Sequence, residues 1–125
     1  MKSNYINWFE IPVTDMSRAS KFYNEVFGIE VQAFPYGEDQ EMGIFAHTQE
    51  TGVAGALVKG QGYEPSAKGP LLYLNGGEDL SNALAKVEAA GGSVLMEKFQ
   101  ISPENGYMAI FLDTEGNKLA MHSMN

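Results

Sequence analysis

Apolar and polar residues alternate near the start of the chain and predict a strand over Tyr5 to Val13. Apolar side chains occupy its odd-numbered positions from Phe9 onward, whereas Trp8 and Glu10 share the opposite face. In a strand, successive side chains point to opposite sides of the sheet. The pattern therefore predicts one face packed in a core and a second face that carries Trp8 and Glu10.

The next segment has the period of a buried helix. Its apolar stripe is Ala19, Phe22, Tyr23, Val26 and Phe27. Thr14 or Asp15 can cap the first turn, because a short oxygen side chain accepts a hydrogen bond from a free backbone N–H. Gly28 is placed to end the helix in a left-handed conformation. We therefore expect a helix over Met16 to Phe27.

Three landmarks of this first half return in the second half at one constant spacing. The pairs are Asp15 and Asp79, Gly28 and Gly92, and Gly52 and Gly116. A constant spacing is typical of a duplicated module. The repeat predicts module 1 over residues 1–62 and module 2 over residues 63–125, joined by a Gly- and Pro-rich linker from Lys59 to Pro70.

The remaining elements follow from the same patterns. Strands are predicted at Ile29–Phe34, Met42–His47, Val53–Val58, Leu71–Asn75, Ser93–Met96, Tyr107–Leu112 and Lys118–Ser123. A second helix should start at Asp79, carry the apolar stripe Leu80, Ala83, Leu84, Val87 and Ala90, and end at Gly91 and Gly92. Residues 97–106, with Pro103 and an Asn105–Gly106 turn, are expected to form a loop.

These elements predict one α+β domain of two tandem βαβββ modules. Each module places a helix on one face of its sheet, so the opposite face must be covered or must bind something. Two such sheets side by side curl into a half-barrel, and the concave side is then a cavity.

The amino-acid composition excludes several classes of site and partner. The 125 residues include no cysteine, which excludes thiolate zinc sites, thiol nucleophiles and disulfides. The net charge of −8 is spread over both halves and argues against nucleic-acid binding. No signal-peptide pattern and no apolar run of the ~20 residues that span a membrane are found, so we expect a cytoplasmic protein without a membrane partner.

Several of these residues together resemble a known family. The first-module pattern is Trp8-Phe9-Glu10-Ile11-Pro12-Val13-x-Asp15-x-x-Arg18-Ala19-x-x-Phe22-Tyr23 with Phe27-Gly28, and the second-module marks are Leu84-x-x-Val87-x-Ala89-Ala90-Gly91-Gly92 and Asp113-x-x-Gly116-Asn117. This pattern is similar to that of the vicinal oxygen chelate superfamily, which includes glyoxalase I, extradiol dioxygenases, and fosfomycin- and bleomycin-resistance proteins. The resemblance covers nearly the whole chain and implies the fold more specifically than the reaction.

The resemblance also implies a divalent metal in the cavity of the catalytic members, held by His, Glu or Gln near the start of the first strand and on the last strand of each module. The corresponding residues here are Trp8, Ala56, Leu72 and Ala120. None of these side chains carries a carboxylate, imidazole or amide donor. We therefore expect no metal and no other cofactor.

Five residues are candidates for a ligand site: Trp8, Glu10, Tyr73, Asn75 and His122. Trp8 is either an aromatic wall for a ligand or a filler of the space that the metal would take. Glu10 and His122 form a candidate catalytic acid–base pair, provided that their strands face each other. The alternatives are a structural partner for Glu10, such as Arg18, and an exposed histidine near the C-terminus.

Tyr73 and Asn75 are either ligand contacts or satisfied buried groups. His47 begins a predicted turn and carries no expected role.

The leading functional hypothesis is a metal-independent small-molecule binding protein whose ligand is amphipathic or aromatic. One alternative is a divergent glyoxalase-like lyase or isomerase, or a dioxygenase. Another is a dimeric interaction module without a ligand. The resemblance implies a homodimer, as is common in this family, and the sheet edges, which need covering, favour the same assembly.

Overall fold

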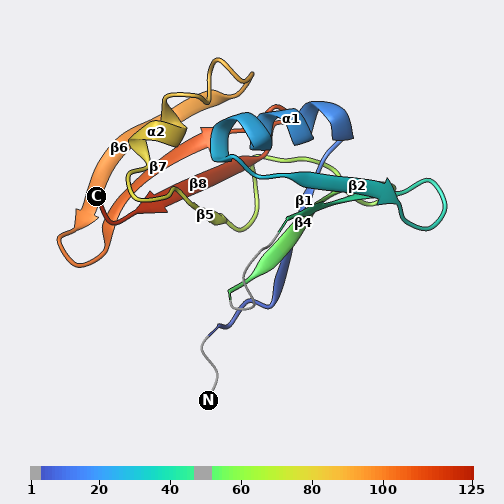
Figure 1. Ribbon diagram of the computed structural model, residues 1–125, viewed down its shortest axis with the longest axis horizontal. Coiled ribbons are helices and arrows are strands. Elements are labelled where there is room, and N and C mark those ends of the chain that lie inside the picture. Colours follow the sequence, from blue (N-terminus) through green and yellow to red (C-terminus); the bar gives the residue numbers. More distant parts are fainter. Residues whose placement is uncertain (1–3, 47–51) are drawn as a thin grey trace.

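A computed structural model describes residues 4–46 and 52–125 (Figure 1). The first half contains β1 (Trp8–Pro12), α1 (Met16–Phe27), β2 (Val31–Pro35), β3 (Glu41–Phe45) and β4 (Ala54–Lys59). The second half contains β5 (Tyr73–Asn75), α2 (Ser81–Leu84), β6 (Ser93–Ser102), β7 (Gly106–Leu112) and β8 (Lys118–Ser123). Both halves have the predicted β-α-β-β-β order, so the expected α+β class is confirmed.

The strands form two four-stranded sheets of identical topology. Sheet 1 has the order β1-β4-β3-β2, and sheet 2 has the order β5-β8-β7-β6. In each sheet the first strand pairs in parallel with the last one, and the other pairs are antiparallel. The edge strands are therefore β1 and β2 in sheet 1, and β5 and β6 in sheet 2.

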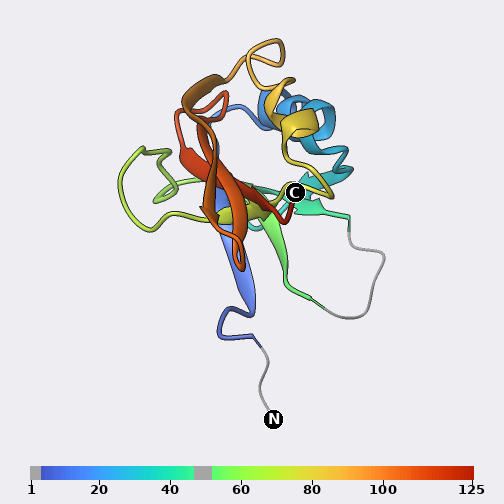
Figure 2. The same ribbon diagram turned by 90° about the vertical axis from the view of Figure 1, so that its left-hand side faces the viewer.

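One apolar core lies between the two sheets and holds α1. Phe22 of α1 packs against Phe111 of β7, and Tyr23 of the same helix packs against Phe45 of β3. Ile11 from β1 is buried in the same cluster. Figures 1 and 2 show α1 in the angle between the sheets. Each sheet therefore has an inner face toward α1 and an outer face away from it.

The first helix begins and ends where the sequence predicts. Asp15 accepts a hydrogen bond from the Arg18 backbone N–H, and Gly28 ends the helix at a φ of 70°. In the second module the left-handed residue is Gly91, at a φ of 103°, rather than Gly92. Gly92 is needed for space, since a Cβ atom there would lie 2.4 Å from the Leu112 carbonyl oxygen.

Two predicted elements of the second half are wrong in length. The regular part of α2 ends at Leu84, because most of the hydrogen bonds from Lys86 onward run from residue i to i−3 in a tighter coil. The predicted loop over residues 97–106 is mostly strand, since β6 continues to Ser102. Register shifts in the β6–β7 pair break the two-residue alternation there and hide the strand in the sequence. His47 lies outside the described residues.

Among the residues that the structure describes, no helix is long and apolar enough to cross a membrane.

A polar clamp joins the N-terminus of α1 to the β7–β8 turn. Glu115, whose side chain is fully buried, accepts hydrogen bonds from the Thr14 and Asp15 amides at 2.8 and 3.0 Å and pairs with Arg18 Nε at 2.7 Å. Burial alone would raise the pKa of Glu115, but the bonds from Arg18 and the two amides outweigh it and lower this pKa to about 2. Nearby, the Tyr23 hydroxyl donates to buried Asp113 at 2.7 Å. These bonds fix α1 to sheet 2.

We predict that Glu115→Gln lowers the free energy of unfolding by about 2 kcal/mol at pH 7, because hydrogen bonds to a buried charge are lost. Chemical denaturation measures the change. Glu25→Gln is the matched control: it removes an exposed pair with Lys21 at 3.9 Å and should change the stability by less than about 0.5 kcal/mol. Equal effects of the two substitutions would contradict a special role for the clamp.

The same carboxylate predicts a pH dependence. As the pH falls from the ordinary pKa of 4.5 toward about 2, Glu115 becomes protonated in the unfolded chain but stays ionised in the folded protein. The free energy of unfolding therefore decreases over this range. The Glu115→Gln variant should lose this part of the acid dependence in denaturation curves measured between these pH values. An unchanged dependence would show that other groups cause it.

Candidate functional site

Trp8 and Glu10 lie on the outer face of sheet 1, as the alternation in β1 predicts. Ile11 and Val13 are buried on the inner side, and Trp8 is 42% exposed. Glu10 is part-buried and stands in register with Ala56 of β4.

Glu10 holds two aromatic side chains in place. Trp8 Nε1 donates to Glu10 Oε2 at 3.2 Å, and the Tyr63 hydroxyl donates to Glu10 Oε1 at 3.0 Å. The bond to the carboxylate raises the pKa of Tyr63, so this hydroxyl keeps its proton. Arg18, considered above as a partner of Glu10, binds Glu115 instead. We call Trp8, Glu10 and Tyr63 the Glu10 cluster.

The sequence patterns do not single out Tyr63, because it lies at the junction of the linker and the second module. A tight turn brings it back: its N–H donates to the Gly60 carbonyl at 3.1 Å, and Gly62 has a φ of 90°. The signal in the sequence is the Gly-x-Gly-Tyr turn directly after β4.

An apolar floor lies beside the Glu10 cluster. Its buried members are Met42, Ala56 and Val58, and Ile44 and Tyr63 pack against them. Ala56 pairs with Glu10 on one side and with Ile44 on the other. Because alanine is small, the position beside the Glu10 carboxylate carries only a methyl group.

The other candidate residues lie on the outer face of sheet 2. Tyr73 pairs with Ala120, and Asn75 pairs with His122. The Tyr73 hydroxyl donates to Met108 Sδ at 3.6 Å, and Asn75 Oδ1 accepts from the Gly77 amide at 2.9 Å.

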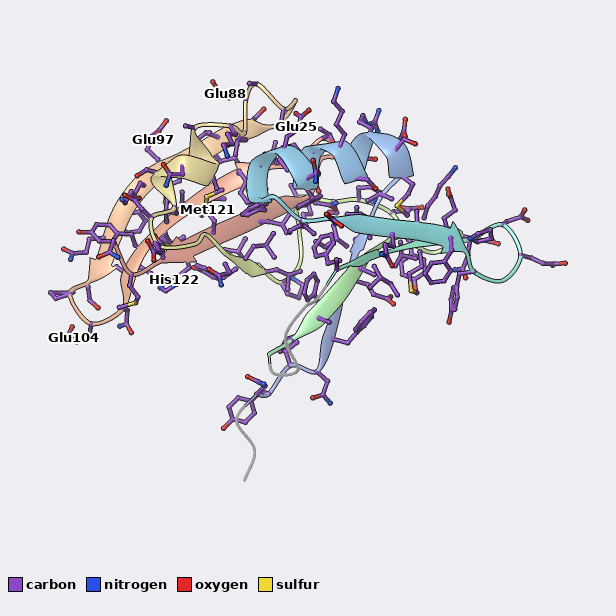
Figure 3. The ribbon with its side chains drawn as sticks, viewed as in Figure 1. Glu25, Glu88, Glu97, Glu104, Met121 and His122 are labelled. Atoms are coloured by element: carbon purple, nitrogen blue, oxygen red, sulfur yellow. The ribbon has the colours of Figure 1, made fainter. Side chains whose placement is uncertain are left out.

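His122 Nε2 lies 2.6 Å from the Asn105 carbonyl oxygen. Because a carbonyl oxygen can only accept a hydrogen bond, Nε2 carries a proton and donates it to Asn105. Figure 3 shows His122 beyond β8 on the side away from α2. Its neighbour Met121 is fully buried in the core, so the two consecutive side chains take opposite faces.

Within one chain, the structure does not bring Glu10 and His122 together. Because α1 lies between the inner faces of both sheets, the two outer faces diverge. Among the hydrogen bonds of residues 4–46 and 52–125, none joins Glu10 to His122. The candidate residues thus lie in two groups on separate sheets.

A cleft of about 1180 Å³ lies between the two halves of the chain. Its lining includes Phe9, Phe27, Leu72, Tyr73 and Asn75. It does not include Trp8, Glu10 or His122, so it is a different space from the outer face of sheet 1.

The residues at the family's metal positions do not fit a metal. Trp8 and Ala56 lie on the outer face of sheet 1, and Ala120 is fully buried. Leu72 contributes only its carbonyl oxygen, which accepts from the Ala120 amide at 2.8 Å. Across the described part of the chain, no three His, Cys, Asp or Glu side chains gather into a group that could hold a metal ion. Divalent metals bind to several such donors.

Comparisons with known proteins agree with this architecture. A protein from Didymella fabae, a glyoxylase-like domain-containing protein, is 33% identical over 122 residues, which cover 93% of this chain and 91% of that protein. TnmS3, an antibiotic binding protein from Streptomyces sp. CB03234, has a similar structure with a TM-score of 0.68 at 23% identity, covering 100% of this chain and 99% of that one.

A glyoxalase I mutant from Zea mays superimposes with a TM-score of 0.71 at 17% identity over 94% of this chain. This chain spans 46% of the length of the maize chain. At these identities the structural likeness shows the fold alone. The sequence model of one family matches residues 5–121. With two βαβββ modules and this match over nearly its full length, the chain belongs to the Glyoxalase/Bleomycin resistance protein/Dioxygenase superfamily.

Proposed function

We propose that this protein binds an amphipathic or aromatic small molecule, without a metal, on the outer face of sheet 1. The Glu10 cluster is the observation that carries the proposal. It joins two aromatic side chains to one carboxylate beside an apolar floor. An apolar surface with a few fixed polar groups is the usual composition of a small-molecule site.

The chemistry of the metal positions supports binding rather than metal-assisted catalysis. Ala56 and Ala120 present methyl groups where metal ligands would be needed, and Trp8 presents an indole. The fold of TnmS3, described as an antibiotic binding protein, gives a precedent for a binding role in a chain of the same extent. Catalytic roles for Glu10 and His122 stay a prediction, since the two side chains lie on different sheets.

We also propose that the binding site is completed in a homodimer. The outer face of sheet 2 exposes large apolar side chains, including Phe99 at 45% and Tyr73 at 50%. Sheet 1 exposes Trp8 at 42% on its own outer face. A two-fold axis that sets sheet 1 of one copy against sheet 2 of the other covers both faces and makes two equivalent sites.

Charge favours this pairing. Glu10 lies on the outer face of sheet 1, whereas Lys118 and His122 share the outer face of sheet 2 through their alternation in β8. The Glu10 carboxylate of one copy would then lie opposite the Lys118 ammonium of the other across the interface. Tyr73, Asn75 and His122 of one copy would complete the site built on Glu10 of the other.

The ligand proposal predicts a signal from Trp8, which is the sole tryptophan. In a screen of chemically diverse aromatic compounds, binding should change Trp8 emission in a saturable way. Tyr63→Ala should then weaken binding of a hit about tenfold or more, because one aromatic wall is lost. Tyr5→Ala is the matched control at a fully exposed tyrosine and should change the affinity less than about twofold. A screen in which no compound alters Trp8 emission would count against the proposal.

The dimer proposal predicts a dimer in sedimentation equilibrium at micromolar concentration. Phe99→Asp should shift the protein toward monomer, because an unpaired charge would be buried in the interface. Met124→Asp introduces the same charge at another exposed apolar position and should leave the dimer intact. Circular dichroism checks that both variants fold. A monomeric wild-type protein would contradict the proposal.

A further inference from the structure

We infer that the ligand of the Glu10 cluster is an organic cation, such as a protonated amine attached to an apolar body. The inference rests on the proposed function, because it assigns a chemical class to the occupant of that same face. It starts from the charge of Glu10 and from the groups that surround this carboxylate.

Glu10 has no cationic partner within the described part of the chain. The ion pairs found there join Arg18 to Glu115, Lys21 to Glu25 and Lys98 to Asp79. Both hydrogen bonds to Glu10 come from neutral groups, the Trp8 indole and the Tyr63 hydroxyl. Its negative charge is therefore oriented by neighbours but not neutralised by them.

The carboxylate still has room to accept further hydrogen bonds. A carboxylate offers about four lone-pair positions, and the bonds from Trp8 and Tyr63 use one on each oxygen. A part-buried charge on an apolar face is costly to leave unpaired. An incoming cation offsets this cost more fully than a neutral donor, because charge-assisted hydrogen bonds are about twice as strong as neutral ones.

The two aromatic rings favour the same class of ligand. The faces of indole and phenol rings attract cations through their quadrupoles. Trp8 and Tyr63 donate to Glu10 through the indole N–H and the hydroxyl, so both rings lie close to the carboxylate, within reach of an apolar cation that pairs with it. The combination of one carboxylate and two rings suits a cation better than an anion or a neutral alcohol.

The floor indicates an organic rather than an inorganic cation. Inorganic divalent cations need several oxygen or nitrogen ligands, and among the described residues Glu10 belongs to no group of three His, Cys, Asp or Glu side chains that could supply them. Beside Glu10 lie the buried side chains of Met42, Ala56 and Val58, and the part-buried side chains of Ile44 and Tyr63 that pack against them give this region its accessible apolar surface. A ligand that carries both a charged head and an apolar body uses both parts of this surface.

The test compares two probes of nearly equal shape. Phenethylamine is a cation at pH 7, and 2-phenylethanol is its neutral counterpart. Calorimetry and Trp8 emission at low salt should show that the wild-type protein binds the amine at least about tenfold tighter than the alcohol. Added salt should reduce this preference, because a part-exposed charge pair is screened.

Three variants locate the charge that causes the preference. Glu10→Gln should abolish the preference for the amine, whereas Glu10→Asp keeps the charge and should keep a preference above about threefold. Glu88→Gln removes one negative charge from the helix side of the molecule and should retain the wild-type preference (Figure 3). Thermal melting confirms that each variant is folded.

Equal binding of the two probes would overturn the inference and leave small-molecule binding on this face intact. A preference that survives in Glu10→Gln would also overturn it, since another group would then recognise the amine. Absence of binding by the amine overturns it as well, while the broader aromatic screen decides the proposed function separately.

Discussion

The packing of α1 between the two sheets is the constraint on which the rest of this structure depends. The helix gives Phe22 to the inner face of sheet 2 and Tyr23 to the inner face of sheet 1, so one helix contributes to the packing of both sheets. Glu115 and Arg18 fix its N-terminus to the β7–β8 turn. Close-packed interiors do not deform continuously, so this shared helix sets the relative placement of the sheets.

The same packing decides where a ligand can bind. The shared core occupies much of the inner faces, and Trp8, Glu10 and His122 lie on the outer faces, outside the cleft between the two halves. Tyr63, from the turn after β4, completes the Glu10 cluster with Trp8 and Glu10. The other candidates, Tyr73, Asn75 and His122, lie on sheet 2. In the proposed homodimer, sheet 1 of one chain and sheet 2 of the other would together line the binding cavity, which links the proposed dimer to the proposed site.

Much of the fold was predictable, because the alternation of apolar residues and the residues that cap the helix match the packing of the folded chain. The alternation of Phe9, Ile11 and Val13 gave the inner face of β1, and Asp15 and Gly28 marked both ends of α1. The length of β6 was not predictable, because its register shifts remove the two-residue period. For the site, the sequence identified Trp8 and Glu10 on a common face. It missed Tyr63, whose contact with Glu10 depends on a turn that only the folded chain reveals.

The central claim is that this member of the superfamily uses its site without a metal, because Trp8, Ala56, Leu72 and Ala120 replace the donors that a metal needs. The most direct test is calorimetric titration of the purified, metal-stripped, tag-free protein with Zn²⁺, Ni²⁺, Mn²⁺ and Fe²⁺. We predict no stoichiometric binding of any of the four and no change in Trp8 emission. Tight binding of one metal per site, with a change in Trp8 emission, would contradict the account and would direct attention to glyoxalase and dioxygenase chemistry.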